Sequence, residues 1–384
     1  MIYRKLLLIT LPLIFLSGCC SKNVYFNKQI YAANNNLVVQ AEHGVIRTYQ
    51  DRHGYFYPDD VSRSSSGLED ISYNHDDWEK TQTKIEANLA KRINQNLGGP
   101  KSQNTLVILI HGFNVISAEP AYSHARDVIN AFNKSKDDIT YWQVNWDGMS
   151  GGFFAQGNAW KGAQANGPLV GLRLRGILNQ IIKVNPDVKI RILTHSSGAF
   201  VAASLLGNNT NALRLAKDCT HDYKFFCLNI HETSEDKLYR VPQPNNLRLG
   251  VIAPATPFNS FAMLRTCPNA TYQRSSTDGL LVKQMKLIVG ANPKDFAISK
   301  AIFSSALHGS TSLGMGGKNC EKLKIGLLDM KKDITYSRNI EAECINFASS
   351  STYNESVLAF WDSHDLSVYL QRDMMPKFLN LLFN

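Results

Sequence analysis

The feature that most constrains this chain is a β-branched run that ends at a serine beside small residues. Residues 189–195 (KIRILTH) have the composition of a buried strand, and residues 200–206 follow as an apolar helix pattern. Ser196 stands at the turn between them. This order is typical of a nucleophile elbow, in which a sharp turn lifts one hydroxyl above a sheet. The positions two before and two after the serine must be small. Gly198 meets this condition, whereas Thr194 is bulkier than the usual glycine.

A second buried strand is predicted upstream, at residues 105–110 (TLVILI). It ends in His111-Gly112-Phe113-Asn114, and a glycine at this point lets the backbone run close to the top of the sheet. We expect the N–H group of Phe113 to form one half of an oxyanion hole. The N–H group of Ser197 would form the other half. Each motif is common alone, but the two in this order favour a hydrolytic site.

With both motifs, the chain resembles α/β-hydrolases. It is most similar to a bacterial family with a strand ending in HGFN or HGYN and an HS-x-G elbow, many of whose members have no assigned substrate. The resemblance covers roughly residues 104–384 and is most specific at 105–114 and 190–206. It implies an α/β-hydrolase fold with a mostly parallel central sheet, helices on both faces and an inserted lid-like segment, which we place at residues 207–246. It also implies the chain order serine, acid, histidine.

The base is predicted from this order. Of the ten histidines, His308 and His364 follow the candidate acids. His364 lies between a predicted strand at residues 356–360 and a closing helix whose apolar positions run from 366 to 381. The resemblance places the base in that loop. His308 lacks this context and is the next alternative.

The acid is predicted in the loop after a strand at residues 285–289. Similar hydrolases carry an aspartate in that loop, which here is Asp295. The alternative interpretation is that Asp295 caps a helix that begins near Phe296. Many relatives have an acidic residue at the end of the preceding strand (residues 247–252), but this chain has Ala253-Pro254-Ala255 there.

Charge and residue spacing point away from several other classes. The net charge is +9, yet no dense run of Lys and Arg marks a nucleic-acid site. Histidine and cysteine spacings form no convincing zinc set, so we expect neither metal nor cofactor. His111 and His195 adjoin the motifs, but in this fold such histidines usually orient the backbone. We therefore expect structural roles for both.

The N-terminus predicts a lipid anchor. Arg4 and Lys5 precede an apolar stretch of eleven residues, too short to span a membrane, and Leu16-Ser17-Gly18-Cys19 follows. This tetrapeptide resembles the bacterial lipoprotein box. It implies a signal peptide over residues 1–18, acylation of Cys19 and a tether over residues 19–36. The alternative is an ordinary cleaved secretion signal. We expect the protein at the bacterial cell envelope, and at the outer membrane if the cell is Gram-negative, since no aspartate follows Cys19.

Cysteine usage fits an extracytoplasmic protein. The chain has seven cysteines, of which six remain if Cys19 is acylated. Their positions suggest Cys219 with Cys227, or Cys320 with Cys344, as disulfide pairs. Spacing alone does not determine the connectivity.

We interpret residues 37–384 as one domain. The remaining predicted elements are short strands at 37–40 and within 44–57 with a hairpin turn at 51–54, helices at 76–96, 121–133 and 169–182, a strand at 140–146, and an aromatic-rich loop at 151–167. Two interpretations of that loop stand: an apolar rim that admits an acyl chain, or a surface loop that packs its own aromatic side chains.

These predictions lead to two hypotheses. In the first, a membrane-anchored serine hydrolase cleaves carboxylic esters, with envelope lipids or small lipophilic esters as substrates. Ser196 attacks, His364 transfers the proton and Asp295 orients the imidazole. Amidase or peptidase chemistry on the same residues remains open. In the second, a non-catalytic envelope binding or assembly lipoprotein retains the hydrolase scaffold, as Thr194 and the missing acid at Ala255 suggest.

Overall fold

The structure is a computed structural model. It describes residues 45–50, 54–56, 75–98, 104–113, 127–128, 130–131, 139–148, 156–206, 242, 244–257, 261, 284–299, 312–331, 340–349 and 364–384. Several predictions lie outside the described residues: the signal peptide, Cys19 and its tether, the strand at 37–40, most of the segment 207–246, His308, and the strand at 356–360.

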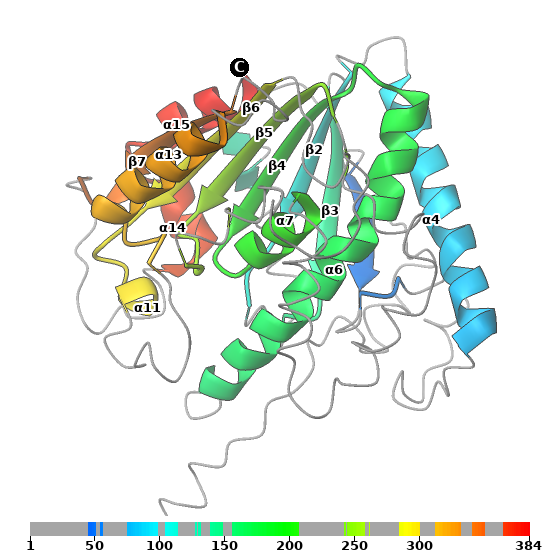
Figure 1. The fold of residues 1–384 in the computed structure, drawn as a ribbon, viewed down its shortest axis with the longest axis horizontal. Coiled ribbons are helices and arrows are strands. Elements are labelled where there is room, and N and C mark those ends of the chain that lie inside the picture. Colours follow the sequence, from blue (N-terminus) through cyan, green and yellow to red (C-terminus); the bar gives the residue numbers. More distant parts are fainter. Residues whose placement is uncertain are drawn as a thin grey trace, which may run out of the picture.

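The core is a seven-stranded, all-parallel sheet with strand order β1-β3-β2-β4-β5-β6-β7 (Figure 1). The strands are β1 (Val45–Gln50), β2 (Thr105–Ile110), β3 (Thr140–Trp146), β4 (Lys189–His195), β5 (Asn246–Ile252), β6 (Gln284–Ala291) and β7 (Ile340–Asn346). Strands β2 and β3 are buried along their whole length, as expected of parallel strands covered on both faces. The predicted α/β fold is confirmed, and the sheet is consistent with an α/β-hydrolase-like fold.

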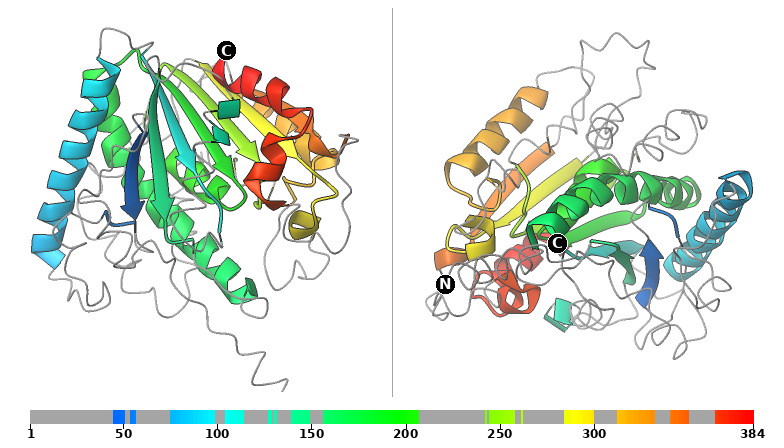
Figure 2. Two further views of the ribbon diagram at one scale, coloured as in Figure 1. Left: turned by 180° about the vertical axis from the view of Figure 1, so that it is seen from behind. Right: turned by 90° about the horizontal axis from the view of Figure 1, so that it is seen from below.

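Helices cover both faces of the sheet. The helices are α4 (His75–Leu97), α6 (Gln156–Val184), α7 (Gly198–Leu206), α11 (Phe296–Ser299), α13 (Lys318–Lys331), α14 (Leu366–Leu370) and α15 (Met375–Phe383), with a 3₁₀ turn at Phe347–Ser349. One hydrophobic cluster joins α4, α6, α7 and α13 to the first face. A second cluster joins α14 and α15 to the other face, which Figure 2 shows from behind. Residues 127–128 and 130–131 are helical, within the predicted helix at 121–133.

The prediction of a loop over residues 151–167 is wrong for residues 156–167, because α6 begins at Gln156. Pro168 lies inside this helix, although proline is ordinarily favoured in the first turn. Contacts with α7 stabilise this arrangement. The hydroxyl of Ser204 donates to the carbonyl oxygen of Pro168 at 2.7 Å. Gly171 lies so close to α7 that a Cβ atom there would collide with the carbonyl oxygen of Val201.

The C-terminal region also differs from prediction. The closing helix expected over residues 366–381 is two helices, because α14 ends at Leu370 and α15 begins at Met375. Pro376 lies in the first turn of α15, where its missing N–H group costs no helical hydrogen bond. Strand β7 was not predicted. It is an edge strand that carries exposed Glu341 and partly exposed Glu343, so it lacks the apolar run that marks the inner strands.

At the other edge of the sheet, β1 covers the first part of the predicted segment 44–57. Gln50 forms an isolated antiparallel bridge with Phe56, and the side-chain amide of Gln50 donates to the carbonyl oxygen of Gly54 at 2.8 Å. The chain therefore reverses direction close to the predicted turn.

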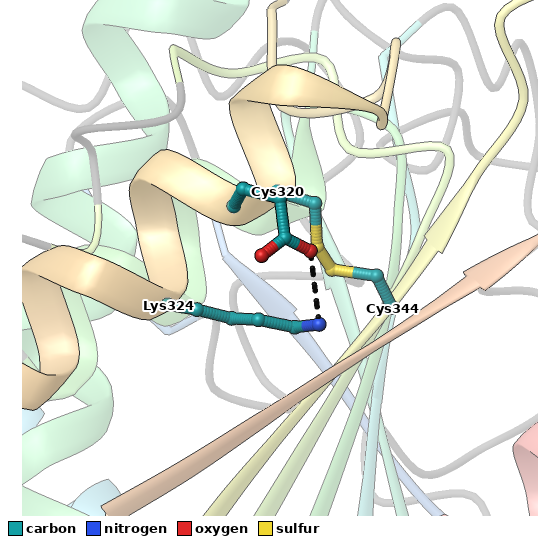
Figure 3. Close-up of a disulfide and its surroundings, with 4 residues drawn as sticks. Cys320, Lys324 and Cys344 are labelled. Atoms are coloured by element: carbon teal, nitrogen blue, oxygen red, sulfur yellow. Dashed lines mark hydrogen bonds and ion pairs between the residues drawn. A yellow bond between two sulfur atoms is a disulfide. The ribbon is translucent and has the colours of Figure 1, made fainter.

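A disulfide joins α13 to β7 (Figure 3). The Cα atoms of Cys320 and Cys344 are 6.4 Å apart. On the same helix, Lys324 Nζ forms an ion pair with Glu321 Oε1 at a distance of 3.1 Å, and Figure 3 shows Lys324 near the disulfide. One of the two suggested pairs is therefore present. Cys219 and Cys227 lie outside the described residues. The disulfide attaches the edge strand covalently to the helix that covers it.

Candidate active site

The sharp turn predicted at Ser196 is present where β4 passes into α7. Ser196 has a φ angle of +53°, a left-handed conformation that costs a residue with a side chain of order 1–3 kcal/mol. Hydrogen bonds to the end of β5 hold it. The N–H of Ser196 donates to the carbonyl oxygen of Ile252 at 2.9 Å, and the N–H of Ala255 donates to that of Ser196 at 3.2 Å. The neighbouring strand thus maintains the strained turn.

The residues on either side of the turn explain how it fits. A Cβ atom on Gly198 would lie 2.6 Å from the carbonyl oxygen of His111 and 2.8 Å from that of Ile110. Only glycine is therefore accommodated there. The side chain of Thr194 is buried, and its hydroxyl has no hydrogen-bond partner among the described residues. The turn forms with threonine at this position, in place of the usual glycine.

Three predicted site residues meet at the carboxyl ends of the strands. His364 lies with its Nε2 atom 2.8 Å from Ser196 Oγ and its Nδ1 atom 2.6 Å from Asp295 Oδ2. An ionised carboxylate can only accept, so Nδ1 carries the proton. In the neutral imidazole Nε2 is then free to accept from the serine hydroxyl. This arrangement matches the order serine, histidine, aspartate of a proton-transfer chain.

The carboxylate of Asp295 is fully buried and is held on both oxygens. Oδ1 accepts from the N–H groups of Ala297 and Ile298 at 2.9 and 3.1 Å, which caps α11. Oδ2 accepts from His364 and, at 2.6 Å, from the hydroxyl of Tyr369. The two alternatives considered for Asp295, helix cap and partner of the histidine, therefore occur together.

These contacts set the charge of Asp295. Burial alone would raise the pKa of this carboxyl. The charge and hydrogen bond of His364, the hydroxyl of Tyr369 and the N–H of Ile298 together lower it by more. The pKa of Asp295 lies below its usual value, so the side chain is ionised at neutral pH.

The strand end at Gly112 approaches the serine closely. A Cβ atom on Gly112 would lie 2.7 Å from Ser196 Cβ and 3.4 Å from Ser196 Oγ. Glycine therefore lets the peptide between Gly112 and Phe113 lie beside the hydroxyl. Among the described residues, no acceptor is found for the N–H groups of Phe113 and Ser197. Both remain candidates for oxyanion donors.

His111 fixes the orientation of this peptide. Its Nε2 atom accepts from the N–H of Trp146 at 3.1 Å, so Nδ1 carries the proton and donates to the carbonyl oxygen of Gly112 at 2.6 Å. The indole N–H of Trp146 donates to the carbonyl oxygen of His111 at 2.9 Å. In a trans peptide the N–H points opposite to the C=O. The N–H of Phe113 is therefore directed away from the imidazole of His111.

Aromatic side chains lie next to this peptide. The ring of Phe113 contacts Trp160 edge-on, with ring centroids 5.1 Å apart, and Trp160 contacts Phe200 at 6.3 Å. Trp160 was placed in a predicted loop and in fact belongs to α6. It is buried, so the aromatic rim expected from the sequence is here a packed wall.

Two further residues border the histidine. The ring of His195 lies 4.9 Å from that of His364, and His195 is buried beside it. Sequence reasoning missed Tyr369, which had been assigned only to the apolar face of the closing helix. No local signal identifies it, because its partner Asp295 is 74 residues away.

The described residues contain no group of three His, Cys, Asp or Glu side chains that could bind a metal ion. None of the helices in these ranges combines the length and hydrophobicity needed to cross a bilayer.

Comparisons with known proteins find one distant structural likeness to report. No family model matches the chain, and no curated protein matches it. A crystal structure of an uncharacterized protein from Bacillus cereus is distantly similar, with 11% sequence identity over 83% of this chain and 74% of that chain. The TM-score is 0.26, which carries no argument about function. These comparisons identify no family, and functional inference rests on the geometry of the site.

Proposed function

We propose that this protein is a serine hydrolase that cleaves carboxylic esters through an acyl-enzyme. One observation carries the proposal. The hydroxyl of Ser196, at a strained turn, is joined through His364 to the buried carboxylate of Asp295 by hydrogen bonds of 2.8 and 2.6 Å. A serine hydroxyl needs such a base to become a nucleophile.

In the acylation step, Ser196 Oγ attacks the ester carbonyl and its proton passes to His364 Nε2. The imidazolium that forms is stabilised by the Asp295 carboxylate, which stays ionised. His364 then gives the proton to the departing alkoxide, and the alcohol leaves. A water molecule repeats the sequence on the acyl-enzyme, releasing the acid and restoring the serine.

The developing oxyanion needs donors beside Ser196. The N–H groups of Phe113 and Ser197 suit this role, because neither has another acceptor among the described residues and Gly112 brings the Phe113 peptide close to Oγ. Loss of one such donor costs on the order of 10²–10³ in turnover in comparable sites.

The aromatic wall of Phe113, Trp160 and Phe200 lies beside the proposed oxyanion donors and favours substrates with an apolar acyl group. The lipoprotein-like N-terminus favours a membrane-anchored enzyme, with envelope lipids or small lipophilic esters as substrates. The Cys320–Cys344 disulfide agrees with an oxidising compartment outside the cytoplasm. Amides are the alternative substrates for the same residues.

A second candidate is a non-catalytic binding or assembly role on the same scaffold. The observation that favours it is the burial of Ser196, which is only 1% exposed. A catalytic hydroxyl must be reached by its substrate, so this burial favours a role in which Ser196 does not react.

Labelling with a fluorophosphonate separates the two candidates, since this reagent bonds only to an activated, reachable serine. The proposal requires labelling that is lost in Ser196→Ala and strongly reduced in His364→Ala. Ser367→Ala is the matched control and should label like the wild type. Hydrolysis of p-nitrophenyl esters of increasing chain length then measures turnover and acyl preference. Folded wild-type protein that neither labels nor turns over these esters would refute the hydrolase proposal.

A further inference from the structure

Tyr369 shares an oxygen atom with the proposed base. Its hydroxyl donates to Asp295 Oδ2 at 2.6 Å, and His364 Nδ1 donates to the same oxygen at 2.6 Å. Tyr369 and Asp295 are both completely buried, so water does not reach the contact between them. Its ring is packed edge-on against Phe347, with centroids 5.4 Å apart. This phenol is thus an ordered part of the site.

The direction of the phenol proton follows from its partner. An ionised carboxylate can only accept a hydrogen bond, so the hydroxyl of Tyr369 donates to Asp295. The side chain of Asn292 also contacts Tyr369, and this contact lowers the pKa of the phenol against the rise caused by burial and by Asp295. Asn292 is itself fully buried, and its Oδ1 atom accepts from the N–H of Lys294 at 3.0 Å.

We propose that Tyr369 is a positioning residue for the base. Its hydroxyl holds Asp295 Oδ2 in place, and that oxygen in turn orients His364. The phenol and the imidazole therefore share one acceptor. The proposal rests on the proposed hydrolase function. It adds a residue that acts on the base without touching substrate. Asn292 supports the same contact by fixing the phenol.

The contact also joins two parts of the chain. Asp295 follows β6, whereas His364 and Tyr369 both belong to the C-terminal segment, five positions apart on either side of the start of α14. Asp295 therefore binds the same short segment at two points. Without the phenol, Asp295 keeps only its bond to the imidazole as a contact with this segment.

Other charged and titratable groups surround this pair. The ring of His195 lies 4.9 Å from that of His364. The guanidinium of Arg372 lies 5.1 Å from the centre of the Tyr369 ring, and its NH1 group donates to the carbonyl oxygen of Phe347. Asp365 follows His364 directly, and its carboxylate accepts from the N–H of Ser367. The positive charge of Arg372 acts on the phenol, whose pKa it lowers against the larger rise caused by burial and by Asp295.

The sign of the expected effect follows from the shared oxygen. Without the phenol, Asp295 Oδ2 has more negative charge available for the imidazolium, so His364 retains its proton to higher pH. The acid limb of the pH profile of kcat/KM should move upward. One net hydrogen bond corresponds to about 0.4–1 pH unit, or a two- to tenfold loss of kcat/KM on that limb.

The test is Tyr369→Phe, which keeps the ring and removes only the hydroxyl. Its matched control is Tyr141→Phe. Tyr141 is also buried, its hydroxyl has no partner among the described residues, and burial raises its pKa to about 12. The measurements are the pH profile of kcat/KM on a p-nitrophenyl ester and the proton NMR resonance of His364 Nδ1–H.

We expect the acid limb to move up by 0.4–1 pH unit in Tyr369→Phe, at unchanged KM, and the Nδ1–H resonance to move downfield. Tyr141→Phe should change neither. A Tyr369→Phe protein with an unmoved resonance overturns the proposal, as does an active variant with an unmoved acid limb. The NMR measurement needs no turnover. A shifted resonance in a protein that hydrolyses no ester would therefore support the role of Tyr369 and refute the hydrolase function.

Discussion

Replacing Asp295 with Asn tests the site most directly, because it changes one oxygen to an NH₂ group and little else. The carboxylate accepts four hydrogen bonds, two from backbone N–H groups of α11 and two from His364 and Tyr369. An amide has one oxygen and so can satisfy only one of these two pairs. In either orientation its NH₂ group faces two donors.

The size of the effect depends on which pair keeps the oxygen. If the oxygen caps α11, the NH₂ group faces His364, which must place its proton on Nε2, toward Ser196. The imidazole then cannot act as a base, and a comparable change in another serine hydrolase lowers kcat about 10⁴-fold. If the oxygen faces His364, the helix loses its cap. Because buried donors lose their acceptor in both cases, we expect the free energy of unfolding to fall by about 1–3 kcal/mol.

The assay is kcat/KM for p-nitrophenyl ester hydrolysis, with urea unfolding measured alongside. Asp365→Asn is the matched control. Asp365 is the neighbouring N-cap, accepting from the N–H of Ser367 at 2.7 Å, and asparagine caps helices as well as aspartate. The control should retain wild-type stability and activity. If kcat/KM of Asp295→Asn stays within about tenfold of the wild-type value, the loss is far smaller than a reversed tautomer causes. That result would refute the assignment of Asp295 as the acid.

Three further predictions follow from the same structure. Gly112→Ala places a Cβ atom 2.7 Å from Ser196 Cβ, so kcat/KM should fall by about 10² or more, whereas Gly326→Ala, with nothing within 4 Å, should leave it unchanged. The Cys320–Cys344 disulfide joins residues 24 positions apart, and its loss should lower the free energy of unfolding by about 3 kcal/mol. An equal free energy of unfolding with and without reductant would contradict this. Folding lowers the pKa of Asp295, so the ionised carboxylate contributes its full stabilisation above about pH 4. Below that pH, the difference in the free energy of unfolding between wild type and Asp295→Asn should shrink, as measured by urea unfolding.

The inner strands were predictable because parallel strands covered on both faces must be apolar throughout. Residues 105–110 and 189–195 show this pattern directly, and the structure has β2 and β4 at these bounds. Strand β7 lacks the pattern because it is an edge strand with glutamates at alternate positions. The start of α6 was missed for a different reason. Residues 151–167 are rich in glycine, which is typical of a loop, and the helix that includes residues 156–167 is stabilised by packing on α7, a contact distant in sequence.

The candidate site divides in the same way. Ser196 and Gly112 were identifiable because a strand end followed by small residues is a local pattern. The role of Asp295 could not be decided locally, since cap and histidine partner are both reasonable for an aspartate before a helix. The structure contains both because the two oxygens of one carboxylate point in different directions. Tyr369 was invisible to sequence reasoning, because its partner comes from a distant loop.

The position of the proposed base depends on how the C-terminal segment sits on the sheet. Phe378 of α15 packs over two strand glycines: a Cβ atom on Gly250 would lie 2.9 Å from its ring, and one on Gly290 would lie 3.3 Å from it. Glycine inside a strand weakens the strand but permits such close approach. A side chain at Gly250 would press on Phe378 of α15, whereas one at Gly290 would first meet the ring of Phe347. His364 directly precedes α14, so the 2.8 Å contact with Ser196 is maintained by packing on the face of the sheet as well as by contacts at its edge.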